Sequence, residues 1–143
     1  MAEHVLGPVL IVEDDDPLAA IVARHLIAHG LPTQVVHSAE EAERRLGAGL
    51  RPSLLLLDIN LPGETGWSLL RGAAYAAAGR PRVIVVSATR ISSSRLREFG
   101  IAGYLPKPFA METLLETVRR HTADGADADA AAGPGERTDV EMP

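Results

Sequence analysis

Four short apolar runs divide this chain, and each one ends in polar residues. The runs are Val9–Val12, Leu54–Leu57, Val83–Val86 and Tyr104–Pro106. The first three are apolar at every position rather than at every second one, which is typical of strands that helices cover on both faces of a sheet. The last run, together with the pair Val35 and Val36, predicts the two edge strands.

Helix-like segments with capping residues lie between these runs. Asp16 followed by Pro17 predicts an N-cap and first turn of a helix that Gly30 ends. Residues 38–41, Ser-Ala-Glu-Glu, form a capping box that opens a second helix ending near Gly47. Three further helices are expected at about residues 66–78, 93–99 and 110–121, and the last of them has its apolar residues at helical spacing.

The alternation of five strands with five helices predicts an α/β fold built from βαβ units. Right-handed crossovers favour a doubly wound, five-stranded parallel sheet of order 2-1-3-4-5, which is a flavodoxin-like arrangement. Ligands of such sheets bind beyond the carboxyl ends of the strands, where the winding reverses. Here that point lies between the strands that end in Glu13-Asp14 and in Asp58.

The composition bounds the class of protein. A length of 143 residues predicts one domain, and 46% hydrophobic with 3% aromatic residues predicts an aliphatic core. The absence of cysteine excludes disulfides, thiolate metal sites and thiol catalysis. The N-terminus does not resemble a secretory signal, and no apolar run approaches the ~20 residues that span a bilayer. We therefore expect a soluble, cytoplasmic protein with no membrane partner.

Charge is distributed unevenly along the chain. Residues 122–143 carry six acids and one base, and they account for the whole formal net charge of −5. Residues 1–121 are balanced at 13 acids and 13 bases, so neither part has the basic surplus of a nucleic-acid binder. Because the last stretch has almost no large apolar residues, we expect a folded domain over 1–121 and a disordered acidic tail over 122–143.

The polar strand ends suggest the chemistry. If the strands are parallel neighbours, their ends bring together Glu13, Asp14, Asp58, Ser87 and Lys107. Three adjacent carboxylates repel one another unless a cation joins them, and Mg²⁺ commonly binds one or two carboxylates together with a phosphate. A carboxylate is also a competent nucleophile toward an activated phosphoryl group. The pattern therefore predicts a metal and phosphoryl site.

Lys107 stands out against the composition of the chain. Thirteen of the fourteen basic residues are arginine, and Lys107 is the only lysine. Its ammonium is a compact point charge that can reach a phosphoryl oxygen. This favours a specific role for Lys107 over a generic surface charge.

Four stretches together resemble the receiver domain of two-component response regulators. They are VLIVEDDDPLA at 9–19, LLLLDINLPGETGW at 54–67, VIVVSA at 83–88 and YLPKPF at 104–109. The resemblance covers about residues 7–121. It implies a phosphoprotein of a phosphorelay in which Asp58 takes its phosphoryl group from a sensor histidine kinase or a histidine phosphotransferase. It implies no enzyme activity beyond self-catalysed transfer to Asp58 and hydrolysis of the product.

The resemblance also implies the metal ligands. Asp14 and Asp58 would bind Mg²⁺ (or Mn²⁺) directly, and the backbone carbonyl of Asn60 would supply a third protein ligand. Glu13 would act through a water molecule. Asn60 and Thr89 lie where the family tunes the lifetime of the phosphoryl group.

Further residues match the family's phosphoryl-binding and switch positions. Ser87 would hydrogen-bond the phosphoryl group, Ala88 would leave the pocket open, and Lys107 would offset the new charge. Tyr104 would turn inward, or else serve only as edge-strand packing. The Lys107-Pro108 peptide bond would be cis. The surface of the fourth helix, fifth strand and fifth helix would then change its affinity for a downstream protein.

Two features depart from the family pattern. The stretch from Ser87 to Lys107 is about two residues shorter than usual, and the helix in it is rich in serine (residues 92–94), so we expect an abbreviated output segment. Pro106 removes a hydrogen-bond donor from the last strand, which is tolerated only at an edge of the sheet.

Several residues receive ordinary structural interpretations. Asp16 is interpreted as the helix cap, Asp15 as a solvated loop charge and Trp67 as a packing residue on a helix face. The five histidines show no metal spacing and no acidic neighbours in the pattern, and none is assigned to a site: His4, His25, His29, His37 and His121.

Three functions remain open on the sequence alone. The first is a stand-alone receiver that signals through phosphorylation-dependent protein contacts. The second is a receiver-like interaction module that is never phosphorylated, which the short output segment keeps open. The third is a Mg²⁺-dependent phosphatase of the haloacid-dehalogenase type, which needs a second aspartate where this chain has Asn60.

Overall fold

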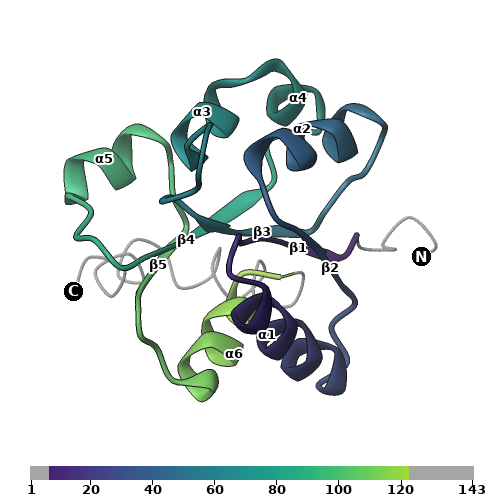
Figure 1. Ribbon diagram of the computed structural model, residues 1–143, viewed down its shortest axis with the longest axis vertical. Helices are drawn as coiled ribbons and strands as arrows, with labels where there is room; N and C mark the ends of the chain where they lie inside the picture. The colour runs from purple at the N-terminus through teal and green to yellow at the C-terminus, as the bar shows by residue number, and fades with distance from the viewer. Residues whose placement is uncertain (1–6, 123–143) are drawn as a thin grey trace.

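The structure is a computed structural model, and it describes residues 7–122. Five parallel strands form one sheet in the order β2-β1-β3-β4-β5 (Figure 1). This confirms the predicted doubly wound α/β fold. The strands are β1 (Val9–Val12), β2 (Thr33–Val36), β3 (Leu54–Asp58), β4 (Arg82–Ser87) and β5 (Gly103–Pro106).

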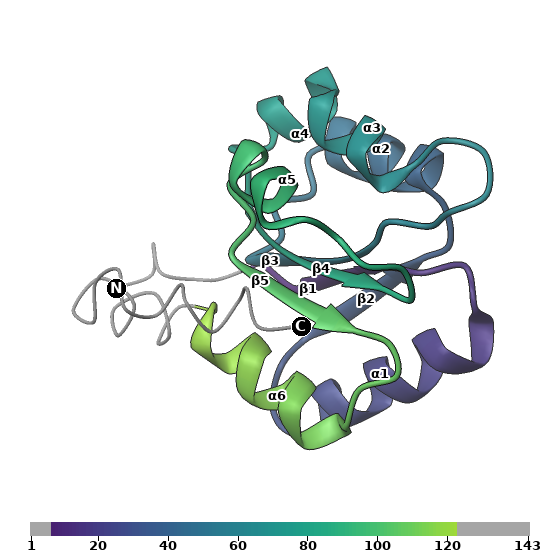
Figure 2. The ribbon, with the colours of Figure 1, turned by 90° about the vertical axis from the view of Figure 1, so that its left-hand side faces the viewer.

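Helices cover both faces of this sheet. Helices α1 and α6 lie on one face, and α2, α3, α4 and α5 lie on the other (Figures 1 and 2). The helices are α1 (Asp16–Ala28), α2 (Ala39–Gly47), α3 (Gly66–Arg71), α4 (Ala73–Ala77), α5 (Ser93–Glu98) and α6 (Met111–Arg120).

The continuous apolar runs are explained by the two cores. Every residue of β1 and β3 is buried. Alternate residues point to opposite faces, so Leu10 and Leu55 pack under α2 to α5, whereas Ile11 and Leu56 pack with α1 and α6. A strand between two helical layers has no solvent face, so it has no polar alternation.

The predicted helix at 66–78 is wrong, because the chain forms two short helices there. Gly72 separates α3 from α4 and has an extended backbone with φ −83° and ψ 162°. Glycine is a poor helix former, since it loses the most conformational freedom when it is ordered. Tyr75 anchors α4 separately, because its hydroxyl donates to the Pro81 carbonyl at 2.7 Å.

The start of α1 also differs from the prediction. Asp15 is the N-cap, and its Oδ1 accepts the Leu18 N–H at 3.1 Å. Asp16 is the first helical residue and Pro17 the second, which proline tolerates because backbone N–H groups in the first turn have no intrahelical partner. The interpretation of Asp16 as the cap is therefore wrong. Asp15 is an exposed loop residue, as expected, and it also caps the helix.

The other predicted details of these elements fit the structure. Ser38 caps α2 and accepts the Glu41 N–H at 3.0 Å. Pro106 lies on the edge strand β5, which pairs with β4 alone in the described sheet. The Lys107-Pro108 peptide bond is cis, as predicted.

Between residues 7 and 122, no helix combines the length and the apolar character needed to cross a bilayer. The predicted disordered tail lies outside the described residues, apart from Thr122.

Candidate functional site

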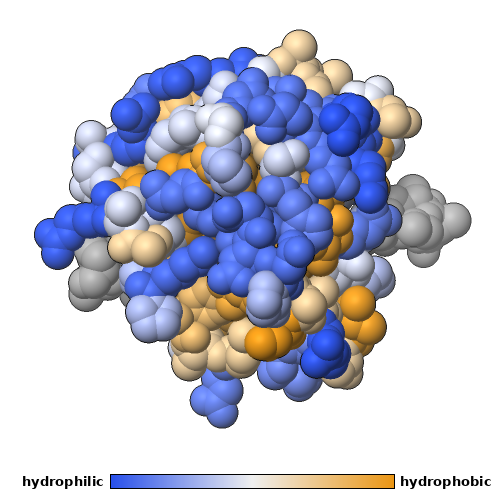
Figure 3. Space-filling model, viewed as in Figure 1, coloured by the Kyte–Doolittle hydropathy of each residue, from blue (hydrophilic) through white to orange (hydrophobic). Residues whose placement is uncertain are grey.

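The carboxyl ends of the central strands meet at one edge of the sheet. Val12 pairs with Leu57, which makes the next residues, Glu13 and Asp58, neighbours across β1 and β3. Ser87 pairs with Pro106 on the other side, just before Lys107. The surface over this edge is largely hydrophilic (Figure 3). The register therefore brings the predicted polar residues to one place.

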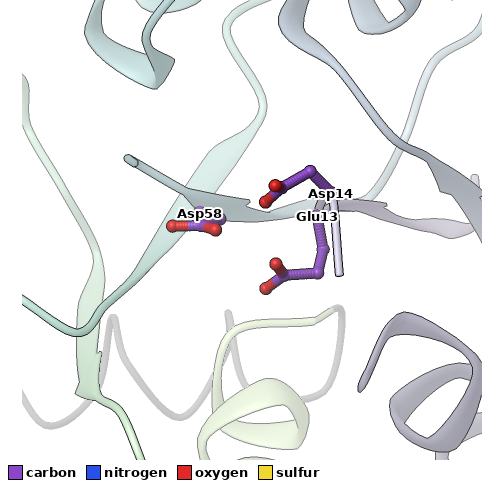
Figure 4. Close-up of side chains that lie close together, drawn as sticks. All are labelled: Glu13, Asp14 and Asp58. Carbon is purple, nitrogen blue, oxygen red and sulfur yellow. The ribbon is translucent and has the colours of Figure 1, made fainter. Parts of the chain in front are cut away.

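Three carboxylates gather there. Glu13 and Asp14 from the end of β1 lie beside Asp58 at the end of β3 (Figure 4). One oxygen from each of the three lies within 4.8 Å of the others. Glu13 and Asp58 are buried, with exposed fractions of 5% and 4%, whereas Asp14 is exposed. This donor set consists of oxygen atoms alone, which suits Mg²⁺ or Mn²⁺ rather than a soft metal.

Lys107 is the cation of this group. Its Nζ lies 2.9 Å from Glu13 Oε1 and 3.4 Å from Asp58 Oδ2. Burial alone would lower the pKa of Lys107, but the hydrogen bond to Glu13 and the charges of Asp58 and Glu13 outweigh it, so the pKa is raised. Lys107 therefore stays protonated at neutral pH.

Opposing effects act on the pKa of Glu13, and the net result is a rise. Burial raises the pKa of Glu13, and the charge of Asp58 adds to the rise. The hydrogen bonds from Lys107 Nζ and from the Asp15 backbone N–H, at 2.9 and 3.1 Å, oppose it. The site thus sets three carboxylates against one ammonium, and a divalent cation would balance the remaining negative charge.

A hydrogen-bonded chain leads from Asp58 to Ser87. The Asn60 backbone N–H donates to Asp58 Oδ1 at 2.9 Å, and the Ser87 hydroxyl donates to Asn60 Oδ1 at 2.9 Å. Ser87 Oγ also lies 2.9 Å from Thr89 Oγ1 and accepts the Thr89 N–H at 3.0 Å. Ser87 is 1% exposed, so its hydroxyl is held in place by these partners.

Thr89 connects this chain to Tyr104. The Tyr104 hydroxyl donates to the Thr89 carbonyl at 3.3 Å, and its ring is buried in the core between the sheet and α2 to α5. Ala88, which lies between Ser87 and Thr89 in the sequence, is exposed. The switch role of Tyr104 and the carbonyl role of Asn60 stay predictions. The sequence linked Thr89 only to phosphoryl lifetime and did not reveal this connection.

His37 was missed as a neighbour of the site. Its Nδ1 lies 3.0 Å from Asp16 Oδ1 and 3.0 Å from the Glu13 carbonyl oxygen. The interpretation that no histidine has acidic neighbours is therefore wrong for His37. The signal lay in the sheet register: Val36 pairs with Val12, so the residue after β2 must lie beside Glu13.

The chain matches known proteins in sequence and in fold. The family model for the response regulator receiver domain matches residues 9–119. The chain is 35% identical over 108 residues to Protein PetR of Rhodobacter capsulatus, which covers 74% of this chain and 44% of that protein. It is 31% identical over 129 residues to Response regulator MprA of Mycobacterium avium, covering 87% and 56% respectively. The chain spans about half the length of these relatives.

Solved structures show the same fold. A response regulator receiver domain protein (CheY-like) from Methanospirillum hungatei JF-1 superposes with a TM-score of 0.72 at 26% identity, covering 80% of this chain and 91% of that one. The chemotaxis protein CheY4 of Vibrio cholerae gives a TM-score of 0.72 at 23% identity, covering 82% and 99%. At that identity the second match supports the fold alone.

Proposed function

The chain belongs to the response regulator receiver domain family, and from this premise we propose that it accepts a phosphoryl group on Asp58. Receiver domains of this family are generally signalling modules rather than enzymes, and histidine kinases phosphorylate response regulators. The proposed donor is a phosphohistidine on such a kinase or on a histidine phosphotransferase. The observation that carries the proposal is Lys107 Nζ placed between Glu13 and Asp58, at 2.9 and 3.4 Å.

The proposed transfer is a single displacement at phosphorus. An oxygen of Asp58 forms a bond to phosphorus while the phosphorus–nitrogen bond of the phosphohistidine breaks, and the departing imidazole keeps the bonding electrons. The Asn60 backbone N–H holds Asp58 Oδ1, which orients the carboxylate for attack. Lys107 offsets the charge that collects on the phosphoryl oxygens.

A bound divalent cation fits this scheme. Asp14 and Asp58 would hold Mg²⁺ or Mn²⁺ directly, the Asn60 backbone carbonyl would add a ligand, and Glu13 would contribute through water. When bound, the cation supplies positive charge next to the incoming phosphoryl oxygens. Without it, the negative charges of Asp14 and Asp58 repel an approaching phosphoryl anion.

The product would rearrange the hydrogen-bonded chain beside it. An aspartyl-phosphate adds roughly −1.5 to −2 charges at Asp58. Ser87 must release Asn60 Oδ1 to donate to a phosphoryl oxygen, and Thr89 is bonded to Ser87 through both its N–H and its hydroxyl. The Thr89 carbonyl in turn accepts the Tyr104 hydroxyl, so we propose that this path carries the change to Tyr104.

The proposed output is altered binding of a downstream protein at the surface of α5, β5 and α6. Thr89 and Tyr104 support this placement, because Thr89 precedes α5 and Tyr104 lies on β5. The family's two-component signalling role is consistent with an output through protein contact.

Intact mass spectrometry after incubation with acetyl phosphate and Mg²⁺ tests the proposal. The wild-type chain should gain the mass of one phosphoryl group, and Asp58→Ala should gain none. Asp16→Asn is the matched control, because Asp16 is an exposed aspartate outside the three-carboxylate group, and it should be phosphorylated as the wild type is. An unmodified wild type would favour the module that works without phosphorylation. An adduct that survives Asp58→Ala would move the acceptor to another residue.

A further inference from the structure

Charge divides the described domain into two unlike parts. Residues 65–97 contain six arginines and no acidic residue, whereas residues 7–64 contain nine acids and four bases. The arginine-rich stretch forms α3, α4, β4 and most of α5. The three helices α3, α4 and α5 cover the same face of the sheet (Figure 2). The domain is therefore acidic at the phosphoryl site and basic along α3 to α5.

Four residues of α3 and of the α5 region stack on one another. The Trp67 and Phe99 rings lie 4.7 Å apart between centroids. The Arg71 guanidinium carbon lies 5.1 Å from the Phe99 centroid, and that of Arg95 lies 5.4 Å from Trp67 and 5.9 Å from Phe99. We call Trp67, Arg71, Arg95 and Phe99 the arginine–aromatic face.

The arginines of this face retain their capacity to bind carboxylates. A guanidinium that stacks uses its planar face, while its N–H donors lie in the plane and fit a carboxylate in a bidentate way. Arg71 is exposed and Arg95 is partly exposed. The Glu98 carboxylate lies 3.8 Å from Arg95, and an ion pair this long and this exposed is weak.

The same chain contains a segment of complementary charge. Residues 123–143 carry six acids and one base, against six arginines and no acid in residues 65–97. The described structure ends at Thr122, directly after α6. The following 21 residues can span at most about 70 Å, which exceeds the width of a domain whose radius of gyration is about 13 Å. The segment can reach any face of its own domain.

We propose that the acidic segment 123–143 binds the arginine–aromatic face of its own domain. Each exposed ion pair is weak, so the contact depends on several pairs and on the high effective concentration that a covalent linker supplies. It is therefore sensitive to salt. Where the proposed function holds, the bound segment competes with a downstream protein for α5. The contact itself does not depend on phosphorylation.

The composition of the chain makes this contact directly measurable. Trp67 is the only tryptophan, so one indole N–H resonance reports on the face, and a chain without cysteine takes a spin label at one introduced site. We would place the label at Ala132→Cys in the full ¹⁵N-labelled chain. At about 0.01 M salt the label should broaden the Trp67 indole resonance, relative to the chemically reduced label. At about 1 M salt, where screening acts over about 3 Å, the broadening should disappear.

Charge variants separate binding to this face from general attraction. Arg71→Gln with Arg95→Gln should remove most of the broadening. Arg24→Gln with Arg44→Gln removes the same charge from α1 and α2 and should leave the broadening intact. Equal loss in both variants would overturn the proposal, and so would a sharp indole resonance at low salt in the labelled wild type.

Mixing tests whether the contact lies within one chain. Chain that carries the spin label but only ¹⁴N is added to ¹⁵N chain that has no spin label, so that only contact between molecules broadens the resonance. No broadening in the mixture supports the proposal. Broadening as strong as in the doubly labelled chain would assign the contact to a second copy and overturn the proposal. Both samples are unphosphorylated, so failure here is distinct from failure of the Asp58 assignment.

Discussion

The phosphoryl site and the arginine–aromatic face are positioned in different ways. Site residues lie at the ends of buried strands, where sheet register places Asp58 next to Glu13. The other face lies on α3 and α5, helices of six residues each, and its positions depend on stacked side chains. Backbone pairing thus fixes the first region, and side-chain contacts fix the second.

This difference has a consequence for how each region responds to substitution. At the site, removing one side chain should leave its charged partners in place, because backbone pairing between the strands positions them. On the arginine–aromatic face, removing one ring removes contacts that hold two helices together. Substitutions at the site should therefore lower stability through uncompensated charge. Substitutions on the arginine–aromatic face should lower it through lost side-chain packing.

The largest effect on stability is expected at the site. Lys107→Ala leaves the buried Glu13 and Asp58 without their cation, and we expect the free energy of unfolding to fall by about 3 kcal/mol at pH 7 without Mg²⁺. Added Mg²⁺ should recover part of the loss by replacing the missing charge. Urea denaturation with and without Mg²⁺ measures both. A loss that Mg²⁺ does not reduce would contradict an electrostatic cause.

A second substitution tests the contact between the site and α3. A Cβ at Gly66 would lie 2.9 Å from Ile59 Cδ1 and 3.1 Å from the Asp58 carbonyl oxygen, which forces the backbone after β3 to move. Gly66→Ala should cost about 2 kcal/mol and slow phosphorylation by acetyl phosphate. Gly47→Ala is the control, because a Cβ there meets nothing within 4 Å. Unchanged phosphorylation in Gly66→Ala would show that Asp58 tolerates the shift.

A smaller mechanical effect is expected at the arginine–aromatic face. Phe99→Ala removes the ring that Trp67 and Arg71 contact, and should cost about 1.5 kcal/mol because Phe99 is only partly buried. The Trp67 fluorescence should change with it. Phosphorylation of Asp58 should be unaffected. A phosphorylation defect as large as that of Gly66→Ala would break the distinction between the two regions.

The smallest effect concerns a carboxylate on α2. Burial raises the pKa of Glu43, and repulsion by Glu64 and Glu40 adds to the rise. Because the folded state binds the proton more tightly than the unfolded state, stability falls as pH rises from 4.5 through the folded pKa. Glu43→Gln should therefore stabilise the chain by about 0.5 kcal/mol at pH 7, the scale of like-charge pairs on a helix. The gain should vanish below pH 4.5 in thermal denaturation.

The sequence predicted the strands and the gathering of Glu13, Asp14 and Asp58 well, because continuous apolar runs mark buried parallel strands and the strand order places their carboxyl ends at one edge of the sheet. It did not predict the break at Gly72, where weak helix propensity and the separate anchoring of Tyr75 both favour two short helices. It also placed the cap of α1 on Asp16 instead of Asp15, since both are good caps and only the loop geometry decides. Such choices depend on contacts that local sequence does not contain.

The sequence also did not predict contacts between residues that are far apart along the chain. His37 and Thr89 reach their partners across elements, at Glu13 and Tyr104 respectively. The strand order was predicted, but the paired residues were not, so the neighbours of each loop residue were undetermined. Residue-level register would have placed His37 beside Glu13.

Locating the phosphoryl group on the chain tests directly whether Asp58 is the acceptor. The chain is incubated with acetyl phosphate and Mg²⁺ and treated with borohydride, which reduces an aspartyl-phosphate to homoserine, and tandem mass spectrometry then locates the converted residue. Conversion is expected at Asp58 alone, and only when Mg²⁺ is present. Conversion at Asp14 instead of Asp58, or equal conversion without a divalent cation, would contradict the proposed site.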